Sequence, residues 1–168
     1  MPALVDSDDN LLSVCRKTHL FGEMDRPQFT AGESLCPLVQ FKDWSVGLAI
    51  FYDFEFSELV RAYALAGAEV VLVPTTNMQP YTGIATRVVP ARAEENKIYV
   101  AYAYRVGSEG NFEYCGLSCV VGPDGLEHAR AAVEEEIIYA SLFKEHLTNI
   151  RKFYLILMTE GLNFILDF

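Results

Sequence analysis

Residues 46–58 of the chain combine an apolar run, a short polar break and a second, amphipathic run. The pattern predicts a buried strand that passes through a sharp turn into a helix. In an α/β hydrolytic fold a nucleophile is usually mounted at such a turn, because the strand end and the helix start expose one side chain. Here the turn carries Phe51, whose ring has neither a proton to lose nor a lone pair to donate. The segment has the setting for covalent catalysis with an inert side chain at its centre.

The wording of this segment resembles the carbon–nitrogen hydrolase (nitrilase/amidase) superfamily. Family members read roughly Gly-x-x-Ile-Cys-Tyr-Asp-x-x-Phe-Pro-Glu around the nucleophile, and residues 47–58 read Gly-Leu-Ala-Ile-Phe-Tyr-Asp-Phe-Glu-Phe-Ser-Glu. Further family-like segments lie at residues 16–32, before this one, and at residues 67–75, 91–96 and 114–125, after it. All of them occur in family order. The wording of residues 76–81 and 89–92 is closest to bacterial amidases of small aliphatic or amino-acid amides.

The resemblance implies a Glu–Lys–Cys triad in which a thiolate attacks an amide or nitrile carbon and a lysine stabilises the oxyanion. Carried over to this chain, Lys17 takes the lysine position and Phe51 takes the nucleophile position. Tyr52 would contribute its backbone N–H to the oxyanion hole, and Asp25 falls where related amidases carry a second, supporting glutamate. Without the resemblance, Lys17 also fits a solvated lysine at a strand end, and Asp25 fits a surface loop acid.

The resemblance also implies a general-base glutamate well before the lysine segment. Residues 1–16 contain three aspartates and no glutamate. We therefore expect residues 1–152 to form an N-terminally truncated domain that lacks the first strands and helix of the family fold. Residues 153–168 read as an apolar tail without family wording, and a shifted reading frame is one hypothesis for it.

Other cysteines are weak substitutes for the missing thiolate. Cys15 lies two positions before Lys17, so on a strand both side chains would face the same side. The matching family position usually holds a packing aromatic residue, which favours a structural role for Cys15. Cys115 and Cys119 are evenly spaced on an expected strand and are also expected to pack.

The remaining polar residues of the motifs also read as structural. Ser57 stands where the family often has proline and is expected to cap a helix, and Glu58 matches a structural family glutamate. The three histidines, His19, His128 and His146, are spread along the chain and are not expected to form a ligand cluster. We therefore expect no metal and no cofactor.

Composition narrows the range of partners. A formal net charge of −10 disfavours nucleic acid, whose phosphates need clustered Lys and Arg, and disfavours anionic membrane surfaces. The acidic N-terminus does not read as a signal peptide, and the longest late apolar run is too short to span a bilayer. The four cysteines show neither zinc spacing nor a disulfide framework, which indicates reduced thiols and a cytoplasmic location.

Alternating strand and helix patterns indicate an α/β fold, which the resemblance makes a partial α-β-β-α sandwich of the nitrilase type. Asp53 and Ser57 are both candidate caps of the first helix, and Gly67 is expected to close it. Helices are expected at residues 57–66, 84–96 and 142–152. Strands are expected at residues 11–16, 37–42, 45–51, 69–73, 98–105, 114–121 and 134–141.

By resemblance, the parent activity is hydrolysis of a small amide or nitrile to an acid and ammonia. The phenylalanine at position 51 predicts that this chain is catalytically impaired. By the same resemblance, its ligand, if any, is a small amide or nitrile. Two alternatives stay open. One is a non-catalytic binding or assembly partner, either as a homo-oligomer or paired with a full-length relative, and the other is a decayed gene product.

Overall fold

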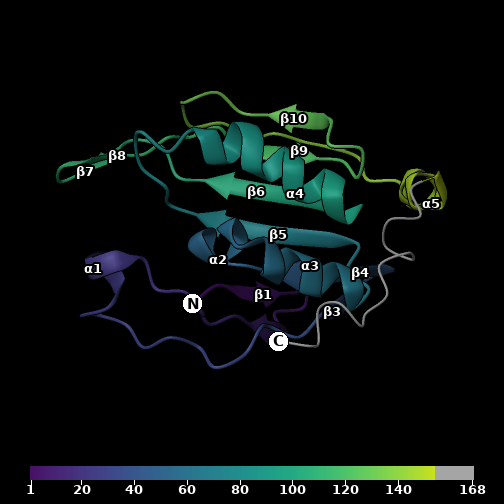
Figure 1. Cartoon of the computed structure of the whole chain (residues 1–168), viewed down its shortest axis with the longest axis horizontal. Coiled ribbons are helices and arrows are strands. Elements are labelled where there is room, and N and C mark those ends of the chain that lie inside the picture. The colour runs from purple at the N-terminus through teal and green to yellow at the C-terminus, as the bar shows by residue number, and fades with distance from the viewer. Residues whose placement is uncertain (154–168) are drawn as a thin grey trace.

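The computed structural model describes residues 1–153. Its centre is a six-stranded mixed sheet in the order β10-β9-β6-β5-β4-β3 (Figure 1). The three parallel strands at the middle are β4 (Trp44–Leu48), β5 (Val70–Thr75) and β6 (Tyr99–Tyr104). They are rich in buried apolar residues, as expected for strands covered on both faces.

Antiparallel strands complete the sheet on both sides. The strand β3 (Val39–Phe41) pairs with β4 through a tight turn, and β9 (Cys119–Val121) pairs with β6. The outermost strand on that side is β10 (Glu127–Arg130), which pairs with β9. Two small antiparallel pairs lie outside the main sheet: β1 (Ala3–Val5) with β2 (Leu11–Val14), and β7 (Ser108–Glu109) with β8 (Phe112–Glu113).

Helices cover one face of the sheet, toward the viewer in Figure 1. These are α2 (Phe51–Glu55), α3 (Ser57–Leu65) and α4 (Val89–Asn96), the last preceded by a π-helical turn, η1 (Ile84–Val88). The main core lies beneath them and includes the fully buried Phe54, Val71 and Tyr102. In the described part of the chain no helix is long and apolar enough to cross a membrane.

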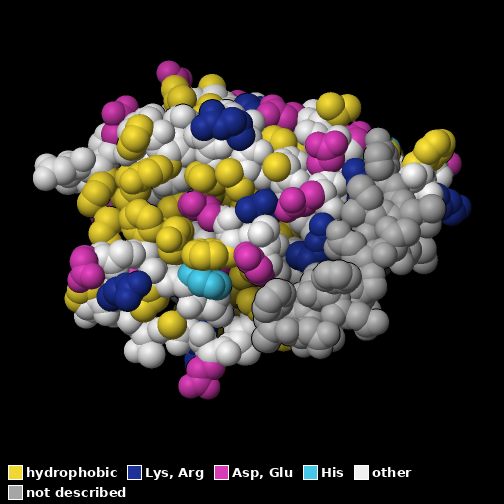
Figure 2. All heavy atoms as spheres, in the orientation of Figure 1, with side chains coloured by type: hydrophobic (Ala, Val, Ile, Leu, Met, Phe, Trp, Pro, Cys, Tyr) yellow, Lys and Arg dark blue, Asp and Glu magenta, His cyan; other side chains and the backbone are white. Residues whose placement is uncertain are grey.

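The helix α5 (Lys144–Phe153) packs separately from the others, against the amino ends of the parallel strands. Its buried Leu147 joins Val46, Val70 and Tyr99, which are residues near the starts of β4, β5 and β6. The short helix α1 (Gly22–Asp25) lies at the other end of the molecule from α5 (Figure 1). Hydrophobic side chains gather on the side of the helical face nearer α1, whereas charged side chains are interspersed over its middle (Figure 2).

Most of the expected elements form, several of them with shorter bounds. The expected strand at 114–121 survives only as β9, because Gly116 and Leu117 adopt left-handed φ angles of +62° and +67° that interrupt an extended chain. The helix expected at 57–66 is α3, and Gly67 closes it with a φ of +98°. The cap predictions were wrong: α3 begins after Phe56, without a side-chain cap.

The strand expected at 134–141 does not form. This segment begins with three consecutive glutamates, and Ile137 and Tyr139 are 78% and 84% exposed, so it has no apolar face to bury against the sheet. The last strand within residues 1–153 is instead β10, which closely follows the turn at residues 122–125. The tail expected at 153–168 lies, apart from its first residue, outside the described residues.

Candidate functional site

The turn between β4 and α2 has the geometry that the sequence predicts. Ile50 is extended, with a φ of −111°, and Phe51 then opens the helix with a φ of +28°. A non-glycine residue rarely adopts a positive φ, and such strained positions cluster at functional sites. The side chain of Phe51 is buried, with 8% of its surface exposed. Position 51 therefore sits on a tight, strained elbow at the carboxyl end of a central parallel strand.

The ammonium of Lys17 lies over this elbow. Its Nζ is 5.4 Å from the centroid of the Phe51 ring and 5.8 Å from the centroid of the Tyr52 ring. The same ammonium forms an ion pair and hydrogen bond with the carboxylate of Asp25. The structure thus brings together all four residues that the sequence proposed for the site. In place of a thiolate, the lysine faces two aromatic rings, which attract a cation weakly through their quadrupoles.

Asp25 ends helix α1 and reaches Lys17 although aspartate is one methylene shorter than glutamate. The backbone N–H of Phe21 also donates to Asp25 Oδ2, at 2.9 Å. Partial burial acts to raise the pKa of Asp25, but the hydrogen bonds from Lys17 and Phe21 outweigh it and leave the pKa below its ordinary value. Asp25 is therefore ionised at neutral pH and balances the lysine charge.

Asp53 has a larger structural role than the helix cap predicted from the sequence. Its carboxylate is almost fully buried and accepts hydrogen bonds from the backbone N–H groups of Thr18 and His19, at 2.7–3.1 Å. It also contacts the Thr18 hydroxyl and His19 Nδ1, each at 2.9 Å. Because Thr18 and His19 directly follow Lys17, this carboxylate ties the lysine loop to α2.

Glu55 is another carboxyl group on α2, and the sequence analysis did not single it out. It is half-buried on α2, and burial raises its pKa, while the positive charge of Lys17 acts in the opposite direction. Perturbed carboxyl groups close to a lysine are typical of sites that move protons. The residue stands four positions after Phe51, at one of the variable positions of the family wording, so its spacing alone carried no signal.

None of the native cysteines is poised as a nucleophile. All four are buried free thiols. Burial and the neighbouring Cys36 raise the pKa of Cys15, whose Sγ donates to the carbonyl of Leu48 at 3.5 Å instead of facing Lys17. Burial likewise raises the pKa of Cys115, and it raises that of Cys119 to about 11. The thiols of Cys15, Cys115 and Cys119 therefore stay protonated near neutral pH and are inert.

The lysine and its aspartate line an open cavity of about 1040 Å³. Ile50, the residue before the elbow, also lines it, together with residues 28–37 of the loop that follows α1. Ser57 and Glu58 lie outside this lining, and the Ser57 hydroxyl donates to the Glu58 carboxylate at 3.2 Å. Both therefore act as structural residues at the start of α3, although Ser57 does not cap it.

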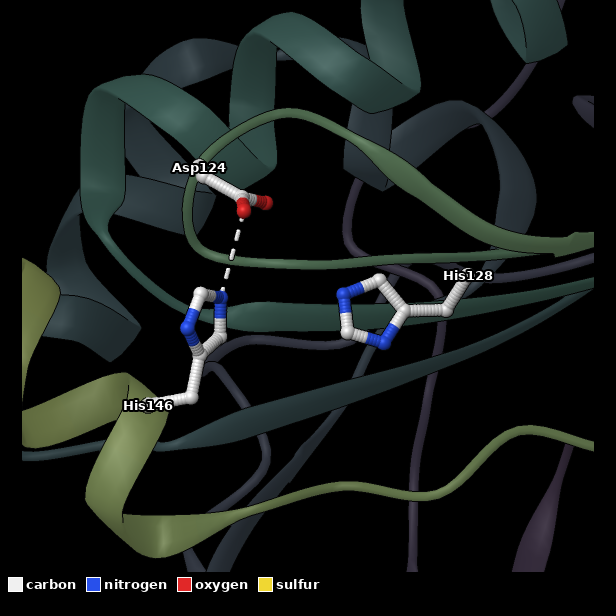
Figure 3. Close-up of side chains that lie close together, drawn as sticks. All are labelled: Asp124, His128 and His146. Carbon is white, nitrogen blue, oxygen red and sulfur yellow. Dashed lines mark ion pairs between the residues drawn. The ribbon is translucent and has the colours of Figure 1, made fainter.

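The histidines depart from the sequence expectation. His19 belongs to the lysine loop and stacks on Phe56, with ring centroids 4.0 Å apart. His128 and His146, by contrast, converge with Asp124 in a second cluster (Figure 3). The sequence analysis did not anticipate that these two histidines lie close together, because the docking of α5 brings together residues that lie 18 positions apart.

The chain belongs to the carbon–nitrogen hydrolase family, which it matches over residues 3–152. It is 46% identical over 142 residues to the "Hydrolase in pqqF 5′region" of Pseudomonas protegens, covering 84% of this chain and 50% of that protein. It is 34% identical over 140 residues to an (R)-stereoselective amidase of Pseudomonas sp., covering 83% of this chain and 50% of the amidase. The chain thus spans about half the length of these curated relatives.

Solved structures agree with the family assignment. An amidase from Nesterenkonia sp. superposes with a TM-score of 0.82 at 35% identity, over 88% of this chain and 56% of that one. The α/β fold class is thereby confirmed as that of nitrilase-superfamily amidases. A mutant of the Nesterenkonia sp. AN1 amidase was solved in complex with butyramide, and another shows acrylamide added at the active site cysteine.

Proposed function

We propose that this chain is an amidase-like member of the family that keeps the anion-stabilising side of the site and lacks its nucleophile. In this proposal it binds a small aliphatic amide or nitrile and hydrolyses it far more slowly than intact relatives do. The observation that carries the proposal is the Phe51 ring on the strained elbow, 5.4 Å from the ammonium of Lys17. Position 51 is where the family wording has its attacking cysteine.

The chemistry of the elbow sets the expected rate. Amide hydrolysis by this family requires a thiolate that forms a bond to the carbonyl carbon and is later released by water. A benzyl group supplies no electron pair for that bond. In a well-studied catalytic triad, removal of the nucleophile alone lowers turnover by about a million-fold. Lys17 and the Tyr52 N–H would still favour a polarised carbonyl, which supports binding without fast turnover.

The general base is the second part of the proposal. The family base glutamate would precede the lysine segment, and residues 1–16 contain no glutamate. Glu55 is the described carboxyl group whose burial raises its pKa beside Lys17, but with no acidic proton at position 51 it has nothing to activate. The truncation expected from the sequence stays a prediction, which the DNA on both sides of the coding segment would test.

Binding and turnover can be separated experimentally. We expect butyramide to shift NMR resonances of the lysine loop while ammonia release stays at background. Lys17→Met should abolish the shifts, whereas Lys152→Met, a matched change at an exposed lysine on α5, should leave them unchanged. Ammonia release at ordinary family rates would refute the impairment. Shifts that persist in Lys17→Met would refute the role of the lysine.

Pairing with an intact relative is the second candidate, and one observation favours it. Within the described residues β3 has a neighbour on one side only, so its outer edge presents unpaired backbone groups. A relative's strand could extend the sheet at this edge. Co-purification with a full-length homologue would support pairing, and a strictly monomeric chain that binds no amide would contradict both candidates and leave a decayed gene product.

A further inference from the structure

Three side chains with metal-ligating chemistry converge at the amino ends of the parallel strands, away from Lys17. Asp124 lies in the turn after β9, His128 lies on β10, and His146 lies on α5 (Figure 3). One ligand atom from each residue lies within 4.8 Å of the other two. Asp124 and His146 are half-buried and His128 is exposed, so the group is open to an ion from solvent.

Two backbone features bring the first two donors together. The N–H of Leu126 donates to Asp124 Oδ1 at 3.1 Å and so orients the carboxylate. Gly122 leaves the room that the side chains use: a Cβ there would lie 2.5 Å from His128 Nε2 and 2.7 Å from Asp124 Oδ1. Any side chain at position 122 would therefore push both ligand atoms away.

The third donor is held by the docking of α5. Leu147 is buried against the sheet, and the Arg151 guanidinium donates to the backbone carbonyls of Lys97 and Ala68. The Nε2 atom of His146 is buried and makes no hydrogen bond with any described residue. Asp124 Oδ2 lies 3.2 Å from this nitrogen (Figure 3). A buried nitrogen that lies beside a carboxylate and a second imidazole, without a hydrogen bond to either, is placed to share a third partner with them.

We propose that Asp124, His128 and His146 bind one divalent first-row transition metal ion, with Zn²⁺ as the representative ion. Two imidazoles and one carboxylate form a donor set that favours such ions over Mg²⁺ or Ca²⁺, which prefer oxygen ligands. Donors bound at about 2.0–2.1 Å lie at most about 4.2 Å apart, so the cluster has to contract slightly. The exposed His128 ring can make this adjustment by rotating.

The proposed ion joins α5 to the hairpin of β9 and β10. Its remaining coordination positions open into a cavity of about 620 Å³. Glu145 and Asp124 line this cavity, as does Glu127, which is paired with Arg130, so the carboxylates outnumber the cations beside it and favour a cation. Because ligand binding to the folded state alone stabilises it, bound Zn²⁺ should raise the unfolding temperature and protect the amides of α5 from exchange.

Calorimetric titration of the chelator-treated 168-residue chain tests the site directly. We expect one Zn²⁺ per chain and no binding of Mg²⁺. His128→Gln and Asp124→Asn should each lower the Zn²⁺ affinity by at least the roughly 10–100-fold that loss of an outer-shell partner costs. His19→Gln removes a histidine outside the cluster and should leave the affinity unchanged. The proposal is wrong if the unsubstituted chain takes up no Zn²⁺, or if the cluster variants bind it equally well.

Two further measurements keep the proposal testable if a ligand variant folds poorly. Gly122→Ala keeps all three donors and should still weaken Zn²⁺ binding, because the added methyl displaces His128 and Asp124. Unchanged affinity in Gly122→Ala with native circular dichroism would contradict the geometry. Co²⁺ substitution should give d–d absorption without a thiolate charge-transfer band, and such a band would place the ion on a cysteine and overturn the assignment.

Discussion

The two ends of the parallel strands differ in what they combine. At the carboxyl ends, Lys17, Asp25 and Phe51 lie together at the positions proposed from the family wording, but the phenyl ring at the elbow cannot react. At the amino ends, His128 and His146 bring two imidazole nitrogen donors together, although neither residue lies in a family-like segment. The difference teaches that family wording marks where a site is positioned, whereas side-chain chemistry has to be read separately at each place.

Charge balance also separates the two ends. The Lys17 ammonium is neutralised by Asp25 and faces aromatic rings, so the site is internally satisfied as it stands. The second cluster offers two imidazoles to a single carboxylate and leaves the buried Nε2 atom of His146 without a hydrogen bond. The first end therefore suits a neutral, polar ligand such as an amide, and the second suits a cation.

Supplying the missing thiol should give the largest change. Phe51→Cys places a thiol beside the Lys17 ammonium, which favours the thiolate. We expect Phe51→Cys to form a stoichiometric adduct with acrylamide, measured by intact-protein mass spectrometry, and the unsubstituted chain to form none, because its own thiols are buried. Lys17→Met in the same background should slow the adduct strongly.

Turnover by the Phe51→Cys variant is a separate question. We expect no restored ammonia release from small amides, because residues 1–16 supply no glutamate ahead of Lys17 to act as the base. Hydrolysis at ordinary family rates would show that another carboxyl group, such as Glu55, serves as the base. Adding Glu55→Gln would then identify it, since that change keeps the side-chain volume and removes the proton acceptor.

Removing Asp53 should destabilise the lysine loop at the carboxyl ends of the parallel strands and leave the histidine cluster at their amino ends unchanged. Asp53→Ala leaves the N–H groups of Thr18 and His19 without their acceptor, and each unsatisfied buried donor costs about 1–3 kcal/mol. We expect the free energy of unfolding, measured with urea, to fall by about 3 kcal/mol or more. The exposed Asp43→Asn is the matched control and should change it by less than about 0.5 kcal/mol. Equal effects of the two changes would contradict the proposed role of Asp53.

The smallest expected effect is the pH dependence that Asp25 contributes. Because its pKa is lower in the folded chain, its ionised form adds stability above the ordinary carboxyl pKa. That contribution is lost as the pH falls through the lower, folded value. Asp25→Asn should lower the free energy of unfolding by about 1 kcal/mol at neutral pH and make it depend less on pH in the acid range. Unfolding curves measured at several pH values check the sign of this pH dependence. The same pH dependence of unfolding for both proteins in the acid range would contradict it.

The sequence predicted the fold best where a local pattern alone decides the structure. The apolar run before Phe51 and the glycine after α3 specify their strand and helix end through burial and backbone freedom. It failed at 134–141, where β-forming residues stand beside three glutamates that the sheet does not bury. Pattern reasoning judged those residues by type, whereas their exposure depends on where the chain leaves the sheet after β10.

The sequence by itself determined the family, the strand and turn that lead into the elbow, and the inert residue at the elbow. All three follow from residue types within short segments. Only the tertiary structure decided that Asp53 secures the lysine loop and that His128 meets His146. Those contacts join residues separated by 18 to 35 positions, so they depend on how helices and loops dock on the sheet and not on any local pattern.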